Sequence, residues 1–178
     1  GGLDEDFVHH MEEIDLCWRL NLVGYQLKAI PSARVYHYGG ATIKPDSYRK
    51  IYWNHRNSLF MLLKNVDRRY LGKTLFGRWL LDLVAIAYAV AKLDFQRAQA
   101  IIAGHNWLVL RARYVRRKRK TVQSLRRVPP EQFRHLFYPK SVALAYFLSG
   151  KQTFTALMEK MPANPDQAPS GQASVPER

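Results

Sequence analysis

The hydrophobic pattern of this chain changes near residue 46, and that change constrains the fold more than any other feature. Before it, apolar residues from His10 to Val23 recur at helical spacing, and Gly24 is placed to end the helix. The runs "YQLKAI" and "RVYHY" then alternate like two short strands separated by "PSA". After it, helical periodicity takes over, with Asp46 or Ser47 placed as a cap. This order predicts an α/β segment followed by helices.

The most apolar of the later segments is "LFGRWLLDLVAIAYAVAKL". Arg78 and Asp82 interrupt it, and its uncharged run from Leu83 to Ala91 is too short to cross a bilayer. A buried helix, a re-entrant element and a helix in the membrane interface are all compatible with this pattern. Further helices are predicted for "DFQRAQAIIAGHNWLVLRARYVRRKRK" and "SVALAYFLSG", and the polar tail from about Pro162 is predicted to be disordered.

Charge is unevenly distributed along the chain. The formal net charge is +14, yet residues 1–40 contain six acids and three bases. The window from Arg111 to Arg127 contains nine basic residues and no acid, interleaved with apolar residues. Such a run is usually a solvated helix face. It also favours an anionic membrane surface or, as the main rival, nucleic acid held by a salt-sensitive electrostatic contact.

The acids gather in "MEEIDLCWR", at the start of the first predicted helix. Acidic side chains in a first turn are stabilised by the helix dipole, and Asp15 with Arg19 makes a favourable i, i+4 pair. That is the structural interpretation. Glu13, however, aligns with Cys17 and Leu20 at the margin of the apolar face. A half-buried carboxylate there is a candidate general base.

His37 stands at the end of the second predicted strand and is followed by Gly39 and Gly40, which permit a ligand or another backbone to come close. A histidine in such a place is more often structural than a ligand. The single cysteine, Cys17, excludes an internal disulfide and is interpreted as a small core residue in a reducing compartment. An enzyme, a nucleic-acid binder and a membrane-surface module all remain open at this point.

The motifs "GGLDEDF", "HMEEIDLCWRL", "VYHYGG" and "YWNHRNSLFMLLKN", in this order and spacing, resemble the C-terminal half of bacterial family 2 glycosyltransferases of the rhamnosyltransferase type. The resemblance is close over residues 1–65, looser through the next helices and absent from the tail. It implies part of a GT-A fold, a Rossmann-like α/β domain, followed by a mainly α-helical C-terminal region. It also implies an inverting, metal-dependent transfer of a hexosyl group from a nucleotide-sugar.

The resemblance assigns roles to particular residues. The family's general base is the second acid of its acidic motif, which is Glu13 here, where a glutamate replaces the more usual aspartate. Asp15 would support the same catalytic helix, and His37 would be one ligand of a divalent ion, Mg or Mn, bound to the diphosphate. Tyr52 and Arg56 fall where relatives hold phosphates, although an ion pair of Arg56 with a surface acid is an equally good explanation. The acceptor side would be lined by His10, Glu12 and Trp18.

Three parts are predicted: residues 1–65 as the end of the catalytic domain, residues 66–150 as a basic helical region near a membrane, and residues 151–178 as a tail. The nucleotide-binding half of the family is expected to precede Gly1, so this chain alone is expected to be inactive. The expected partners are a nucleotide-sugar donor, a glycan or lipid-linked acceptor and an anionic membrane surface, without nucleic acid. The expected location is cytoplasmic, peripheral at the inner face of the cell membrane. The alternative is a nucleic-acid-binding or membrane-surface scaffold module without catalysis.

Overall fold

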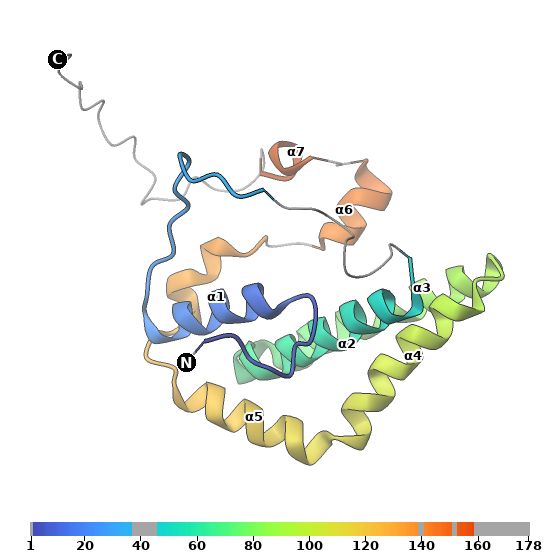
Figure 1. Cartoon of the computed structure of the whole chain (residues 1–178), viewed down its shortest axis with the longest axis horizontal. Helices are drawn as coiled ribbons and strands as arrows, with labels where there is room; N and C mark the ends of the chain where they lie inside the picture. Colours follow the sequence, from blue (N-terminus) through green and yellow to red (C-terminus); the bar gives the residue numbers. More distant parts are fainter. Residues whose placement is uncertain (1, 37–45, 139–140, 151–152, 159–178) are drawn as a thin grey trace. The chain divides into compact units, whose positions relative to one another are not determined.

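The computed structural model of the chain describes residues 2–36, 46–138, 141–150 and 153–158. Its elements divide between two compact units, residues 1–129 and 130–178, and the boundary predicted after residue 65 falls inside the first unit. In chain order they are α1 (Glu12–Val23), α2 (Tyr48–Asn65), α3 (Arg68–Ala91), α4 (Phe95–Leu110), α5 (Ala112–Ser124), a 3-10 helix (Pro130–Leu136), α6 (Val142–Ser149) and α7 (Phe154–Met158) (Figure 1).

The described residues contain no β-strand, so the predicted α/β fold with a partial GT-A sheet is wrong. Residues 25–36, which hold most of the alternating pattern, are exposed and follow an irregular path. Ile30, Val35 and Tyr36 among them present large apolar side chains to solvent. A strand needs a neighbouring strand to accept its backbone hydrogen bonds, and none of the described segments supplies one.

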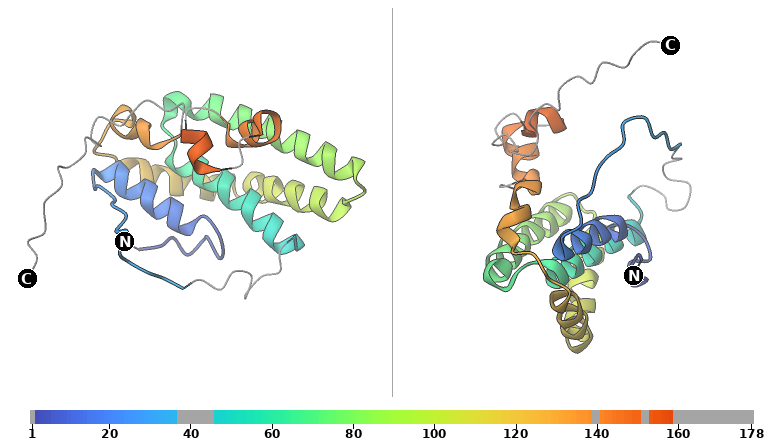
Figure 2. Two further views of the ribbon diagram at one scale, coloured as in Figure 1. Left: turned by 90° about the horizontal axis from the view of Figure 1, so that it is seen from above. Right: turned by 90° about the vertical axis from the view of Figure 1, so that its left-hand side faces the viewer.

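α2 is the central helix of the first unit, because it contacts α1, α3, α4 and α5. The Ser47 hydroxyl caps it by accepting a hydrogen bond from Lys50 N, which confirms one of the two predicted caps. The next two helices, α3 and α4, pack against each other as a hairpin that turns at residues 92–94 (Figures 1 and 2).

Two apolar clusters hold these helices together. The first joins the N-terminal segment, α2 and α5, and consists of Phe7, Phe60, Met61 and Val115. The second joins α2 and α4, with α3 packed against it, and consists of Ile51, Ala100 and Ile101. At the crossing of α2 and α4 the backbones approach closely, since a Cβ added to Gly104 would lie 3.1 Å from Arg56 N.

Several predicted helices are confirmed with changed limits or surroundings. α1 ends where expected, with Gly24 at a φ of 101° and its N–H bonded to the oxygens of Leu20 and Asn21. The single helix predicted over residues 94–120 is instead two, α4 and α5, which meet at Arg111. Cys17, predicted to be a core residue, is exposed.

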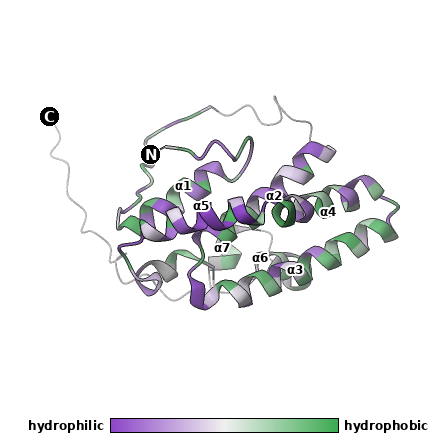
Figure 3. Ribbon diagram, turned by 90° about the horizontal axis from the view of Figure 1, so that it is seen from below, coloured by the Kyte–Doolittle hydropathy of each residue, from purple (hydrophilic) through white to green (hydrophobic). Residues whose placement is uncertain are grey.

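α3 contains all but the last two residues of the apolar segment 75–93, and of the three alternatives for this segment a buried helix does not fit. Only 11% of its apolar 18-residue window is buried. By length and composition it is the one helix of the described ranges that qualifies to cross a membrane. Figure 3 shows the contrast between the largely hydrophobic α3 and the hydrophilic α5.

Candidate functional site

The loop before α1 is held onto α2 by two buried side chains. Arg56 Nη1 donates to the backbone oxygen of Asp6 at 2.6 Å, and Asn57 Nδ2 donates to those of His9 and His10 at 2.6 and 3.0 Å. His10 itself has a φ of 65°, a left-handed conformation that is uncommon outside glycine. The shape of the loop that leads into the acidic helix is therefore imposed by α2.

Aromatic rings enclose the guanidinium group of Arg56. Its Cζ lies 4.8 Å from the ring centroid of Trp53 and 4.1 Å from that of Trp107, and the residue is 4% exposed. Burial lowers the pKa of Arg56 below its ordinary value, while the adjacent Tyr52 favours the charged form. The two residues predicted to hold phosphate thus lie together, but the guanidinium group faces protein. Their role in binding phosphate stays a prediction.

Asp15 is fully buried where α1 meets α2. Its carboxylate accepts hydrogen bonds from Arg19 Nε and Asn65 Nδ2, both at 2.8 Å, and lies 3.1 Å from Lys64 Nζ. Lys64 also pairs with the carboxylate of Asp4 in the preceding loop. This geometry fits the predicted function of fixing the acidic helix, because Asp15 orients α1 from its inner face.

Glu13 lies in the first turn of α1 and is exposed. The prediction that it is half-buried at the apolar margin is wrong, because α1 turns Asp15 and Leu22 inward and so leaves positions 13 and 17 outside. Its side chain is therefore open to solvent. The positive end of the helix dipole stabilises a negative charge at this position.

Two polar atoms beside Glu13 are buried without a hydrogen-bond partner in the part of the chain that the structure describes. They are Oε2 of Glu12 and Nε2 of His10. Buried polar atoms are nearly always paired in folded proteins, so each such atom calls for an explanation. Because both atoms are enclosed by protein, the surface around Glu13 does not present them to a ligand.

The residues described above do not include the predicted metal ligand. His37 lies outside the described residues, and within them no group of three His, Cys, Asp or Glu side chains is placed to hold a metal ion. The resemblance expects the other ligands of the Mg or Mn ion in the nucleotide-binding half, so the described residues do not test this site. His37 stays a predicted ligand.

A second polar cluster, which the sequence did not reveal, lies between α2, α3 and α4. The buried carboxylate of Asp82 lies 2.9 Å from His55 Nδ1, 3.0 Å from His105 Nε2 and 3.0 Å from Arg78 Nε. Burial opposes its ionisation, but the hydrogen bonds from His105, His55 and Arg78 outweigh burial and hold the pKa of Asp82 well below its ordinary value. Three helices thus share one ionised carboxylate.

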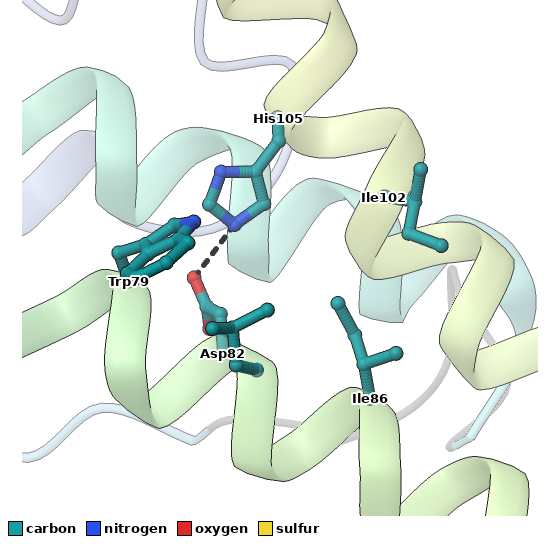
Figure 4. A pocket seen from close by; sticks show the side chains of 6 residues that line it. Trp79, Asp82, Ile86, Ile102 and His105 are labelled. Carbon is teal, nitrogen blue, oxygen red and sulfur yellow. Dashed lines mark hydrogen bonds and ion pairs between the residues drawn. The ribbon is translucent and has the colours of Figure 1, made fainter.

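A small pocket of about 120 Å³ opens beside this cluster (Figure 4). Its walls are mostly apolar, and Asp82 and His105 are its ionisable lining residues. The lining residues are Trp79, Asp82, Leu83, Ile86, Ile102 and His105. An aspartate inside an otherwise apolar helix was the one sequence signal for this cluster. Its histidine partners come from other helices and could not be inferred from spacing.

The basic window of residues 111–127 divides into internal and external parts. Lys118 pairs with carboxylates of the loop before α1, and Arg119 and Arg126 donate to backbone oxygens at the end of α2. The other six basic residues are exposed. One third of the positive charge is therefore used to hold the fold together, which lowers the charge density open to an anionic partner.

The chain matches no protein-family model, no curated protein and no solved structure.

Proposed function

We propose that this chain supplies the acceptor-activating part of an inverting, nucleotide-sugar-dependent glycosyltransferase, with Glu13 as the general base. The motif "HMEEIDLCWRL" suggests the chemistry. The observation that carries the proposal is the position of Glu13, which is exposed on a helix whose other face is fixed by the buried Asp15. A base must reach its substrate yet stay in one place, and this arrangement meets both needs.

The proposed step is a single displacement. The acceptor hydroxyl oxygen attacks the anomeric carbon, the bond from that carbon to the nucleoside diphosphate oxygen breaks, and Glu13 takes the hydroxyl proton. The nucleoside diphosphate leaves with the bonding electron pair, and the configuration at the anomeric carbon inverts. Because a sugar hydroxyl is a poor nucleophile at neutral pH, removal of its proton in the transition state is expected to contribute about 10² to 10⁴ in rate.

The acceptor would lie over the start of α1. Glu12 and His10, which were predicted to line the acceptor side, are close to Glu13 in the sequence and are the candidates to bind further hydroxyl groups of a glycan. The clamped loop would keep them at a fixed distance from Glu13, since Arg56 and Asn57 hold its backbone. Phosphate binding by Tyr52 and Arg56 and metal binding by His37 remain predictions.

The test compares variants of the longest natural polypeptide that contains this sequence, assayed by release of nucleoside diphosphate in the presence of acceptor. Glu13→Gln is expected to lower kcat by at least about 10²-fold, and Glu13→Asp to retain part of the rate. Glu5→Gln, an exposed acid of the preceding loop, is the matched control and is expected to leave the rate unchanged. Full transfer by Glu13→Gln would exclude Glu13 as the base.

A further inference from the structure

The outer face of α3, defined here as the solvent-facing side chains from Phe76 to Tyr88, is apolar. Its large exposed residues recur at helical spacing, so they form one continuous stripe along the helix. They are Phe76, Leu80, Leu83, Val84 and Tyr88, with Trp79 at the margin. Contiguous apolar surface of this kind is rare on a free soluble protein and marks a contact with a partner or a membrane.

The two charged side chains of the same stretch face the neighbouring helix α2 instead of solvent. Between residues 76 and 91 α3 contains only Arg78 and Asp82 as charged residues. The two pair with each other, and both also bond to α2, through His55 and Ser58. The outer face of α3 is therefore free of charge although the helix is not. Because both charges are paired inside the protein, about 16 residues, or roughly 24 Å of helix, present only apolar and small side chains to solvent.

Cations flank this stripe at both ends. Arg68, Arg69 and Lys73 precede it, and Lys92 follows it. From residue 68 to residue 110, which covers α3 and α4, the chain contains six basic residues and two acids, and both acids, Asp82 and Asp94, are engaged by basic partners. An apolar stripe with a cationic border is complementary to a bilayer surface that carries anionic headgroups.

We propose that the outer face of α3 docks onto an anionic lipid bilayer, with the helix lying along the membrane interface. A transmembrane position does not fit, because the opposite face of α3 packs on α2 and α4 and contains the charged pair of Arg78 and Asp82. A second copy of the chain fits less well, since two stripes with the same cationic border would repel each other. Docking is independent of sugar transfer and is tested without a donor.

The test is flotation of the purified chain with vesicles of phosphatidylglycerol and phosphatidylcholine, and with phosphatidylcholine alone. The chain is expected to float with the anionic vesicles and less with the neutral ones. The double variant Leu80→Glu, Val84→Glu is expected to lower partitioning at least about tenfold. Its control, Gln96→Glu with Gln99→Glu on the exposed side of α4, changes net charge equally and is expected to retain binding.

A second measurement keeps the inference testable if the glutamates disturb the fold. An environment-sensitive fluorophore is attached to Val84→Cys or to Gln99→Cys, each in a Cys17→Ser background. Emission from position 84 is expected to shift to the blue on anionic vesicles, and emission from position 99 is expected not to shift. Equal flotation of the two double variants would overturn the proposal. Loss of self-association in Leu80→Glu, Val84→Glu without loss of flotation would assign the face to a second copy instead.

Discussion

Lys64 Nζ lies 3.1 Å from Asp15 Oδ1, and neither side chain is exposed to solvent. Removing two charges from water is costly, and the cost is offset here by further hydrogen bonds to both groups. Asp15 also accepts from Arg19 and Asn65, and Lys64 also pairs with Asp4. The pair joins α1 and its preceding loop to α2 by charge, and Lys64 Nζ also lies 4.6 Å from the ring centroid of Phe7 and 4.9 Å from that of Phe60.

The Asp15→Asn variant is expected to lower the free energy of unfolding by about 3 kcal/mol, because the buried ammonium group of Lys64 loses one of its two carboxylates. Urea unfolding followed by circular dichroism measures this. Glu13→Gln, in the same helix but exposed, is the control and is expected to change stability by less than about 0.5 kcal/mol. Equal effects of the two substitutions would contradict the different roles assigned to these acids.

Acid is expected to weaken the loop before α1 through Asp4. Burial works against ionisation of Asp4, but Lys64 and Lys118 outweigh it and hold its pKa well below the ordinary value. A folded-state pKa below the unfolded one stabilises the fold above the unfolded pKa of about 3.9, and this contribution is lost as the pH falls. The stability difference between the natural chain and Asp4→Asn is therefore expected to be largest near neutral pH and to shrink below about pH 4.

The measurement is urea unfolding of both proteins at several pH values. Glu5→Asn, which replaces an exposed neighbour of Asp4, is the control and is expected to change stability near neutral pH by less than about 0.5 kcal/mol. A constant difference for Asp4→Asn across the same range would show that the two lysines do not depend on the ionised form of Asp4.

Gly104→Ala is expected to destabilise the chain by about 1 to 3 kcal/mol, because the new methyl group would lie 3.1 Å from the backbone nitrogen of Arg56 and would push α2 and α4 apart. Gly77→Ala in α3 is a matched control, since nothing lies within 4 Å of its added Cβ. That change is expected to stabilise by about 0.5 to 1 kcal/mol, as alanine favours helix. Thermal unfolding of both variants tests the packing at this crossing.

Asp82→Asn is expected to loosen α3 from α2 and α4, at a cost of about 3 kcal/mol, because Arg78, His55 and His105 would lose their shared carboxylate. Amide hydrogen exchange along α3 is the most direct readout, and faster exchange is expected from residue 75 onward. Asp94→Asn, which changes the partly exposed cap of α4, should leave exchange in the middle of α3 unaltered. Unchanged protection in Asp82→Asn would mean that apolar packing alone positions the helix.

Sequence reasoning worked where the physical cause is local. Gly24 ends α1 because a left-handed residue is needed there, and Ser47 starts α2 because its hydroxyl accepts from a free amide; both signals lie within a few residues of their effect. The alternating runs "YQLKAI" and "RVYHY" led to a wrong prediction of strands. Alternation indicates which side chains share a face, but it does not indicate whether a partner strand exists. Strand pairing depends on residues far along the chain.

The candidate site shows the same limit. Helical phase was read from the apolar residues of α1, which placed Glu13 inward. In the structure, polar contacts decide which face of α1 is buried. Lys64 and Asn65, about fifty positions away in the sequence, bind the carboxylate of Asp15 and hold it inside. Asp82 and His55 are 27 residues apart in the sequence, so their contact could likewise not be predicted from spacing. Long-range ion pairs have no spacing rule comparable to the helical repeat.

The backbone oxygens at the end of α2 are bonded by side chains of α5 and the segment after it: Arg119 reaches Leu63 and Val66, and Gln123 and Arg126 reach Asn65. A helix terminus normally relies on its own flanking residues or on water for these partners. Here the last turn of α2 is completed by chain that is synthesised some fifty to sixty residues later. A nascent chain that has not yet released α5 from the ribosome would carry a frayed α2, so the segment that anchors Glu13 would reach its final form only after α5 has emerged.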